Sequence, residues 1–265
     1  MTARPPINFD RYPLEDPSAV AAIIADAKAN LDRDQYCSLP DFLTNEALTE
    51  EAARVQSLKD KANPANSLRN CYLQRQGDPN LPADHPRNIM HPARYRMLAA
   101  DLLPDTSALK LMYYWAPFQR MVAGIVGEET LYPSADPLQP VNVICYADGD
   151  QSAWHFDSTN AFTMTLMLQA AEKGGDFEMA PNTRESAENE HIPYMTEVLT
   201  GPSDRVKSVG RSEGELTIFR GCNSLHRVSP VEGPRDRLMA VFVYENEPGI
   251  IGDPEVNMTV YGRTG

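Results

Sequence analysis

Val141–Tyr146, with the sequence VNVICY, is the stretch that decides the fold class of this chain. Its β-branched and aromatic residues favour a strand, and the turn signal Asp148-Gly149-Asp150 closes it. Similar short runs, separated by Gly, Pro and Asp turns, follow it at residues 161–168, 176–179, 215–219 and 238–244. Such a series of short strands predicts an antiparallel jelly roll, or double-stranded β-helix, of the cupin-like kind.

Helical patterns dominate the chain before about residue 133. Apolar residues recur at helical spacing in residues 16–33, and a second helix is expected to begin at Thr44 or Asn45. The pattern returns in residues 93–103 and again in residues 106–126. Pro117 should kink or split the last of these helices.

Helices first and strands later predict an α+β fold. We expect one structural domain, in which a helical N-terminal region, residues 1–132, packs on a barrel-like catalytic core, residues 133–265. Residues 63–92 show no clear period and are long for a loop, so our hypothesis is that they cover the active site. Arg87 and Arg94 would then be candidates for binding a substrate carboxylate.

Composition excludes several classes of partner. The 265 residues carry a formal net charge of −13, which argues against binding to nucleic acid or to an anionic membrane surface. No stretch has the ~18–20 apolar residues of a membrane span, and the N-terminus lacks the features of a signal peptide. The four cysteines are scattered, as reduced thiols in a cytoplasmic protein would be.

His155-Phe156-Asp157, followed seventy-one residues later by His226, carries the chemistry. On an extended strand, residues i and i+2 project to the same face, so His155 and Asp157 can grip one ion from one side. Two imidazoles and one carboxylate are the ligands of the facial triad of non-haem Fe(II) oxygenases, which leaves three metal positions open. A lone His-x-Asp is a weak signal, and its context decides.

The context is an ordered set of motifs in the last half of the chain. Gly174-Gly175 offers a sharp turn into a strand, His226 lies in a strand-like run, and Arg237 begins another strand eleven residues later. From about residue 141 to residue 244 this order resembles the Fe(II)/2-oxoglutarate-dependent oxygenases, most closely their prolyl-hydroxylase-like branch. Four stretches also look like the carrier-independent amino-acid halogenases and their hydroxylase relatives: residues 154–157, 165–169, 174–184 and 226–248. The N-terminal helices match only in general layout.

The resemblance implies roles for individual residues. His155, Asp157 and His226 would hold Fe(II). Arg237 would form a bidentate salt bridge with the distal carboxylate of 2-oxoglutarate, because a planar guanidinium matches a carboxylate fork.

Other residues compete with Arg237 or add to it. Arg235 lies at i−2 on the same face, and Arg227 should point away from the face of its neighbour His226. Tyr146 either adds a hydrogen bond to the co-substrate or is a buried core residue. For contact with a polar substrate the further candidates, which could equally satisfy backbone groups or solvent, are Asn142, Asn160, Asn182 and Arg184.

Position 157 bears on the type of reaction. In the halogenases that the chain resembles, Gly replaces the carboxylate ligand and leaves a coordination site for chloride. Asp157 fills that site here, so the resemblance implies hydroxylation, with Fe(II), 2-oxoglutarate and O₂ as cofactors and co-substrates and with succinate and CO₂ as products. We expect a small-molecule substrate, a free amino acid or a derivative of one. The alternatives are a protein hydroxylase of the prolyl type and a non-catalytic, metal-binding cupin-like barrel.

Overall fold

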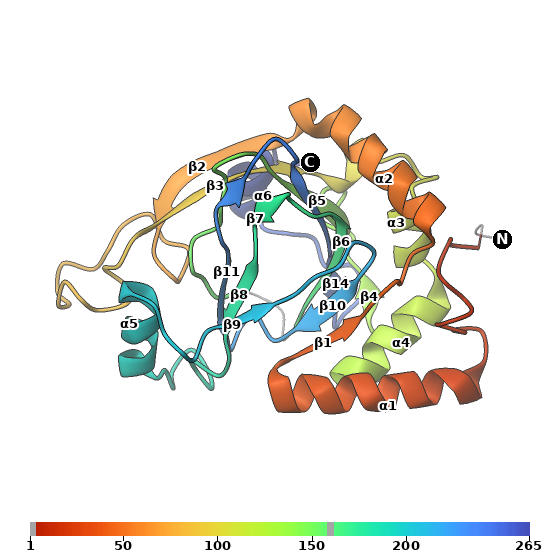
Figure 1. Ribbon diagram of the computed structural model, residues 1–265, viewed down its shortest axis with the longest axis horizontal. Helices are drawn as coiled ribbons and strands as arrows, with labels where there is room; N and C mark the ends of the chain where they lie inside the picture. The colour runs from red at the N-terminus through yellow and green to blue at the C-terminus, as the bar shows by residue number, and fades with distance from the viewer. Residues whose placement is uncertain (1–3, 158–161) are drawn as a thin grey trace.

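The computed structural model describes residues 4–157 and 162–265. Its strands form two main antiparallel sheets that face each other, with helices packed outside the larger sheet (Figure 1). The larger sheet has the order β1-β10-β6-β13-β5-β3-β2, and the smaller one has the order β11-β8-β9. Two two-stranded pairs, β12-β7 and β14-β4, complete the strands of the described residues. In that part of the chain, no helix is long and apolar enough to cross a membrane.

The strands have these bounds. The larger sheet contains β1 (Tyr36–Leu39), β2 (Asn63–Arg69), β3 (His91–Leu98), β5 (Val141–Tyr146), β6 (Thr163–Gln169), β10 (Leu216–Phe219) and β13 (Arg237–Phe242). The smaller sheet contains β8 (Phe177–Ala180), β9 (Lys207–Val209) and β11 (Leu225–Val228). The short pairs contain β4 (Tyr132–Pro133), β7 (Lys173–Gly174), β12 (Val231–Glu232) and β14 (Tyr244–Glu245).

The helices have clear start and stop signals. The helical elements are α1 (Pro17–Asp34), α2 (Asn45–Leu58), α3 (Ala108–Tyr113), α4 (Ala116–Val126), α5 (Ile192–Thr200), α6 (Pro254–Tyr261) and two single 3₁₀ turns, η1 (Lys59–Lys61) and η2 (Ala100–Leu102). Asp16 caps α1 by accepting hydrogen bonds from the backbone of its first turn, and Thr44 caps α2 in the same way. Pro117 lies in the first turn of α4, so the expected split of residues 106–126 is confirmed.

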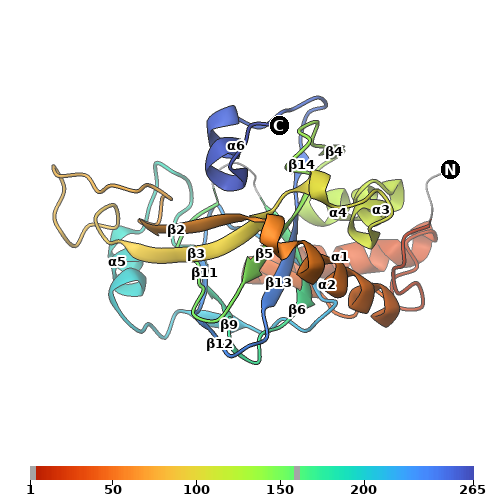
Figure 2. The same ribbon diagram turned by 90° about the horizontal axis from the view of Figure 1, so that it is seen from above.

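The larger sheet separates the main core from the interior of the barrel, because successive side chains along its strands point to opposite faces. On one face, apolar side chains pack with α1 to α4 in the main core: Val141, Val143 and Cys145 of β5, Met164, Leu166 and Leu168 of β6, and Leu238, Ala240 and Phe242 of β13. The residues between them face inward. This two-residue period brings Asn142, Thr165 and Arg237, among others, into the barrel. Helices α1 to α4 lie on the other side of the larger sheet (Figure 2).

Two predictions about the first half of the chain were wrong. Residues 63–69 form strand β2 rather than a loop, and residues 91–98 form strand β3 rather than the start of a helix. The residues of β3 alternate with period two: Ala93, Tyr95 and Met97 face the interior. The antiparallel pairing of β3 with β5 and β2 therefore overrides the local helical pattern.

The division at residue 132 remains a prediction. The first part of the chain is not exclusively helical, since it contributes β1, β2 and β3 to the larger sheet. The predicted strands β5, β8, β10 and β13 are present, and β6 covers most of the predicted run, of which residue 161 lies outside the described residues.

Candidate metal centre and co-substrate cavity

A cavity of about 290 Å³ lies between the two main sheets. Its walls are the inward side chains of the strands described above, and His155, Asp157 and His226 line it together. Apolar side chains make up much of the remaining wall, among them Met97, Ile144, Met239 and Val241. A site with few polar groups in a mostly apolar cavity is typical of small-molecule binding.

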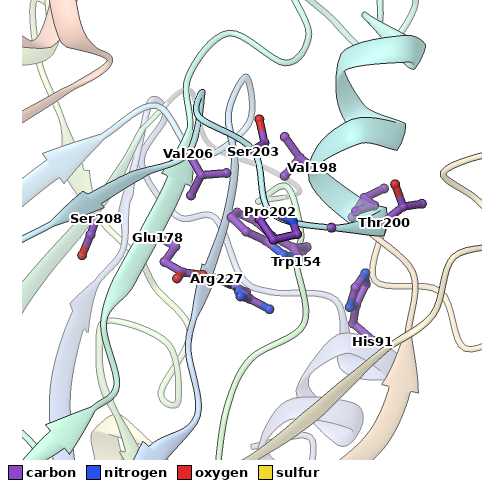
Figure 3. A pocket seen from close by; sticks show the side chains of 12 residues that line it. His91, Trp154, Glu178, Val198, Thr200, Pro202, Ser203, Val206, Ser208 and Arg227 are labelled. Atoms are coloured by element: carbon purple, nitrogen blue, oxygen red, sulfur yellow. Dashed lines mark hydrogen bonds and ion pairs between the residues drawn. The ribbon is translucent and has the colours of Figure 1, made fainter.

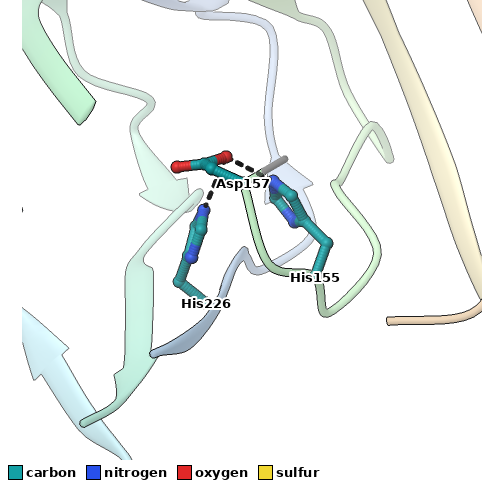
Figure 4. Close-up of side chains that lie close together, drawn as sticks. All are labelled: His155, Asp157 and His226. Carbon is teal, nitrogen blue, oxygen red and sulfur yellow. Dashed lines mark ion pairs between the residues drawn. The ribbon is translucent and has the colours of Figure 1, made fainter. Parts of the chain in front are cut away.

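The backbone brings the two histidines side by side. His226 lies on β11, and His155 pairs with it in an isolated antiparallel bridge. The two residues exchange backbone hydrogen bonds of 3.0 and 3.1 Å. His155 and Asp157 thus lie in an extended segment that pairs with β11 and not in a regular strand. The docking places three side chains from two distant segments at one point (Figure 4).

Each histidine ring is held in one orientation by a backbone carbonyl. His155 Nδ1 lies 2.8 Å from the Ala153 oxygen, and His226 Nδ1 lies 3.0 Å from the Ser224 oxygen. A carbonyl oxygen only accepts hydrogen bonds, so Nδ1 must carry the proton and donate it. In the neutral ring this leaves the lone pair of Nε2 free, which is the state that binds a metal.

The three potential ligand atoms converge. Asp157 Oδ1 lies 3.6 Å from His155 Nε2 and 3.5 Å from His226 Nε2, and the ligand atoms of all three residues lie within 4.8 Å of one another. Burial, and next the neighbouring His226, lower the pKa of His155 to about 4, so its ring is neutral at neutral pH. Burial alone would raise the pKa of Asp157, but His226, His155 and a hydrogen bond from Thr163 hold it well below its usual range.

Two neighbours support the carboxylate. The Thr163 hydroxyl donates a hydrogen bond to Asp157 Oδ2, which fixes the orientation of the carboxyl group. Gly221 approaches from the other side, where its carbonyl accepts a hydrogen bond from the Asp157 backbone N–H at 3.1 Å. A Cβ atom at position 221 would overlap Asp157 Oδ2 and lie 3.1 Å from Cε1 of His226. Only glycine fits there without displacing a ligand.

Arg237 lies in the wall of the same cavity, and only 1 % of its surface is exposed. It pairs with Tyr146 across β13 and β5, and its guanidinium carbon lies 5.4 Å from the centre of the Tyr146 ring. Its Nε and Nη2 have no hydrogen-bond partner among the described residues. Buried donors without a partner are costly, so this orphaned fork fits an anionic ligand that the protein is built to receive.

Gly175 makes room for that side chain. Both Gly174 and Gly175 have φ of 64°, as the expected sharp turn requires, and a Cβ at position 175 would lie 2.9 Å from Arg237 Cδ.

Each of the other candidate arginines has a protein partner for its guanidinium group. Arg235 lies at the surface, where Nη1 is 2.7 Å from Glu213 Oε1, so the structure does not bring it to the site. Arg94 pairs with Asp150 at 2.6 Å, and Arg87 stacks over the Tyr72 ring. Arg227 lines the cavity, but its Nε pairs with Glu178 at 2.6 Å.

Of the four polar candidates, one lines the cavity. Asn142 does so, although its amide donates hydrogen bonds to Gln139 and Tyr261. Arg184 is held by Glu190 and by a backbone carbonyl, and Asn182 lies in another surface hollow. Asn160 is outside the described residues.

Two arginines that line the cavity were missed by sequence reasoning. Arg69 ends β2, and two of its nitrogens are held by the Ser67 hydroxyl and the Leu73 carbonyl. Arg211 lies in the connection between β9 and β10. Neither has a local motif that could have identified it, because strands from other parts of the chain bring them to the cavity.

A second, larger hollow of about 610 Å³ opens behind Trp154, lined also by His91, Val198 and Glu178 (Figure 3). Arg227 borders both spaces. None of the three converging side chains lines this second hollow, so the chemistry belongs to the smaller cavity.

Comparison with known families identifies this arrangement. Residues 20–251 match the family described as HalD, Halogenase D. The chain belongs to the HalD halogenase family. The match covers most of the chain, including the N-terminal helices that resembled known enzymes only in general layout. Among curated proteins, none matches the chain.

Solved structures support the fold of this HalD family member. An oxidoreductase of the 2OG-Fe(II) oxygenase family from Burkholderia pseudomallei is 16 % identical, with a TM-score of 0.52 over 86 % of this chain and 92 % of that one. A prolyl-4-hydroxylase from Pseudomonas putida is 15 % identical, with a TM-score of 0.52 over 83 % and 98 %. The epimerase SnoN in complex with Fe³⁺, alpha ketoglutarate and nogalamycin RO is 14 % identical, with a TM-score of 0.53 over 84 % of each chain. The predicted double-stranded β-helix is thereby confirmed.

The family also accounts for the cavity. Fe(II), 2-oxoglutarate and O₂ are the cofactor and co-substrates of Fe(II)/2-oxoglutarate oxygenases, to which the HalD family belongs. Two imidazoles and one carboxylate suit Fe(II), and the guanidinium of Arg237, whose Nε and Nη2 lack a partner, suits a carboxylate of 2-oxoglutarate. These residues therefore fit the cofactors that the family uses.

Proposed function

We propose that this HalD family member is a hydroxylase of a free amino acid or a close derivative. The observation that carries the proposal is Asp157, whose carboxylate lies at 3.5–3.6 Å from both histidine Nε2 atoms. The family description is that of a halogenase. Halide would need the metal position that this carboxylate is placed to fill.

Different residues of the cavity have different roles in the proposed reaction. His155, Asp157 and His226 hold the metal, with Thr163 and Gly221 fixing the carboxylate. When bound, Fe(II) with 2-oxoglutarate and O₂ supplies the oxidising chemistry: one oxygen atom enters a C–H bond of the substrate, and the other enters succinate as CO₂ leaves. The apolar wall limits access of water to the reacting atoms.

The size and charge of the cavity support a small substrate. A space of about 290 Å³ that also has to hold 2-oxoglutarate leaves room for a molecule of amino-acid size. Arg69 borders it with two nitrogens held in place, so the rest of its guanidinium can bind a substrate carboxylate. We therefore assign binding of the substrate carboxylate to Arg69 instead of Arg87 or Arg94.

Succinate formation tests the proposal. Anaerobically purified protein, loaded with Fe(II), is supplied with 2-oxoglutarate, O₂ and each proteinogenic amino acid in turn, or with a proline-containing peptide. We expect succinate to form with one or a few amino acids, in an amount equal to the hydroxylated product. Succinate with the peptide alone would indicate a protein hydroxylase. No succinate with any substrate, together with tightly retained Zn²⁺, would indicate a non-catalytic metal-binding barrel.

A further inference from the structure

Two buried guanidinium groups, rather than one, lie in the wall of the cavity. Arg211 and Arg237 both line it, and the Nε and Nη2 atoms of each are buried without a hydrogen-bond partner among the described residues. The carboxylates that act on them electrostatically, Glu215 on Arg211 and Asp176 on Arg237, provide no hydrogen-bond partner for these nitrogens. Four buried donor nitrogens without a partner thus belong to residues in the wall of this cavity, and one bidentate contact would use only two of them.

Arg211 is held in a fixed position. Its Nη1 donates a hydrogen bond of 3.0 Å to the Thr165 hydroxyl and lies 3.9 Å from Met239 Sδ, while its guanidinium carbon lies 3.7 Å over the Phe177 ring. These contacts come from β6, β13 and β8, so three strands orient one side chain. A side chain positioned this way, with its remaining nitrogens free, is arranged for a ligand and not for solvent.

Arg211 lies close to Arg237. Met239 is two residues beyond Arg237 on β13, so the two side chains share the inward face of that strand. The two cations are close enough for Arg237 to contribute, after burial, to lowering the pKa of Arg211 to about 9. Like charges in a buried site repel each other, and an anion bound between them would offset that repulsion.

We propose that Arg211 is a second positioning residue for 2-oxoglutarate, which binds the same distal carboxylate as Arg237. A carboxylate has about four lone-pair directions, so it can accept from two guanidinium groups at once. Arg237 then supplies the fork from β13, and Arg211 supplies donors from the β9–β10 connection, anchored by Thr165. The proposal rests on the co-substrate site of the proposed function and holds whether the enzyme hydroxylates or halogenates.

Equilibrium binding without turnover tests this assignment. Mn(II)-loaded protein is titrated anaerobically by calorimetry with 2-oxoglutarate, and separately with 2-oxovalerate, in which a methyl group replaces the distal carboxylate. Arg211→Gln should weaken 2-oxoglutarate binding by about 10- to 100-fold, as the loss of charged hydrogen bonds implies. It should leave 2-oxovalerate binding unchanged within about twofold. Arg211→Lys keeps the charge but loses the fork, so it should recover part of the affinity for 2-oxoglutarate alone.

Controls distinguish a contact from a structural role. Arg235→Gln removes a nearby but surface-exposed arginine and should leave both affinities unchanged. Equal weakening of both ligands by Arg211→Gln would overturn the proposal in favour of a role in packing. Unchanged binding of both would also overturn it. If Arg211→Gln fails to fold, Arg211→Lys decides, since a selective loss of 2-oxoglutarate affinity supports the contact and a non-selective or absent loss rejects it.

Discussion

Asp157 is the residue on which the choice of reaction depends. Its carboxylate lies between two imidazoles whose Nδ1 atoms are tied to backbone carbonyls, so all three groups are positioned before a metal arrives. Preorganisation of this kind lowers the cost of binding and fixes which positions on the metal stay open.

Removal of that carboxylate should abolish hydroxylation. Asp157→Gly opens one metal position and removes one negative charge, so we expect hydroxylation to fall by at least about 100-fold and Fe(II) to bind more weakly. Succinate and product formation measure the first effect, and metal titration measures the second. Thr163→Ser, which keeps the hydroxyl group, serves as the control that should retain most of the activity. Undiminished hydroxylation by Asp157→Gly would remove Asp157 from the metal site.

Gly221 offers a second test at the scale of a single atom. Gly221→Ala places a Cβ in the space of Asp157 Oδ2, so we expect at least about 10-fold weaker metal binding with the fold retained. The matched control is Gly201→Ala, because Gly201 has an extended backbone and nothing within 4 Å of an added Cβ. Equal metal affinity in the two variants would show that Asp157 can move without loss.

At the scale of single residues, the sequence identifies some site members and not others. His155, Asp157 and Arg237 stand in local patterns whose period indicates which side chains share a face. Arg211 reaches the cavity from a connection between two strands, and its partner Thr165 is forty-six residues away. No local pattern encodes that approach, since it depends on how the two sheets pack.

At the scale of elements, the segment before β3 combines strand and loop. β2 and Leu73 form part of the cavity wall, whereas the rest of the connection up to β3 extends away from the barrel beside α5 (Figure 1). Asn70 is fully buried at the base of this connection: its Oδ1 accepts from the backbone of Tyr72 and Gln74, and its Nδ2 donates to the Arg87 carbonyl. The side chain of Asn70 therefore holds the base of this connection in place through hydrogen bonds.

Loss of that amide should loosen the connection. Asn70→Ala leaves buried backbone donors without a partner, so we expect the free energy of unfolding to fall by about 1–3 kcal/mol. Urea denaturation measures the loss, and hydrogen exchange should rise in residues 70–90. Asn80→Ala, an exposed position in the same connection, should change neither quantity. Equal effects of the two substitutions would contradict the role given to Asn70.

Prediction of elements from sequence succeeded where the local period matched the tertiary contacts. The β-rich run at residues 141–146 and the Pro117 split followed from local chemistry alone. Strand β3 did not, because its apolar residues also fit a helix, and only pairing with β5 and β2 decides between the two periods. Strand pairing over distances of this length is a tertiary effect.

At the scale of the whole molecule, a protein of net charge −13 encloses a positively charged cavity. Arg69, Arg211, Arg227 and Arg237 line that cavity, and Asp157 is the one acidic residue among the described residues that line it. A dicarboxylate would offset two of these positive charges, and Asp157 with the two histidines would hold a metal ion, so both ligands should stabilise the folded state by mass action.

Metal removal should lower thermal stability. At a metal concentration about 100 times the Kd, binding contributes about 2.7 kcal/mol, which for a chain of this size corresponds to a fall in Tm of about 5–10 °C on chelation. Differential scanning calorimetry with and without a chelator measures the change. Asp157→Gly should show a much smaller change, since it has lost a ligand. An identical shift in both proteins would indicate that the stabilising metal binds elsewhere.

Hydroxylation in the presence of halide is the reaction that the position of Asp157 predicts. With an amino-acid substrate found by succinate formation, the reaction is run in chloride buffer under isotopically labelled O₂, and the product is weighed by mass spectrometry. We predict a product that is heavier by one labelled oxygen atom, with no chlorinated species. A product in which chlorine replaces hydrogen would contradict the assignment of Asp157 as the ligand that fills the halide position.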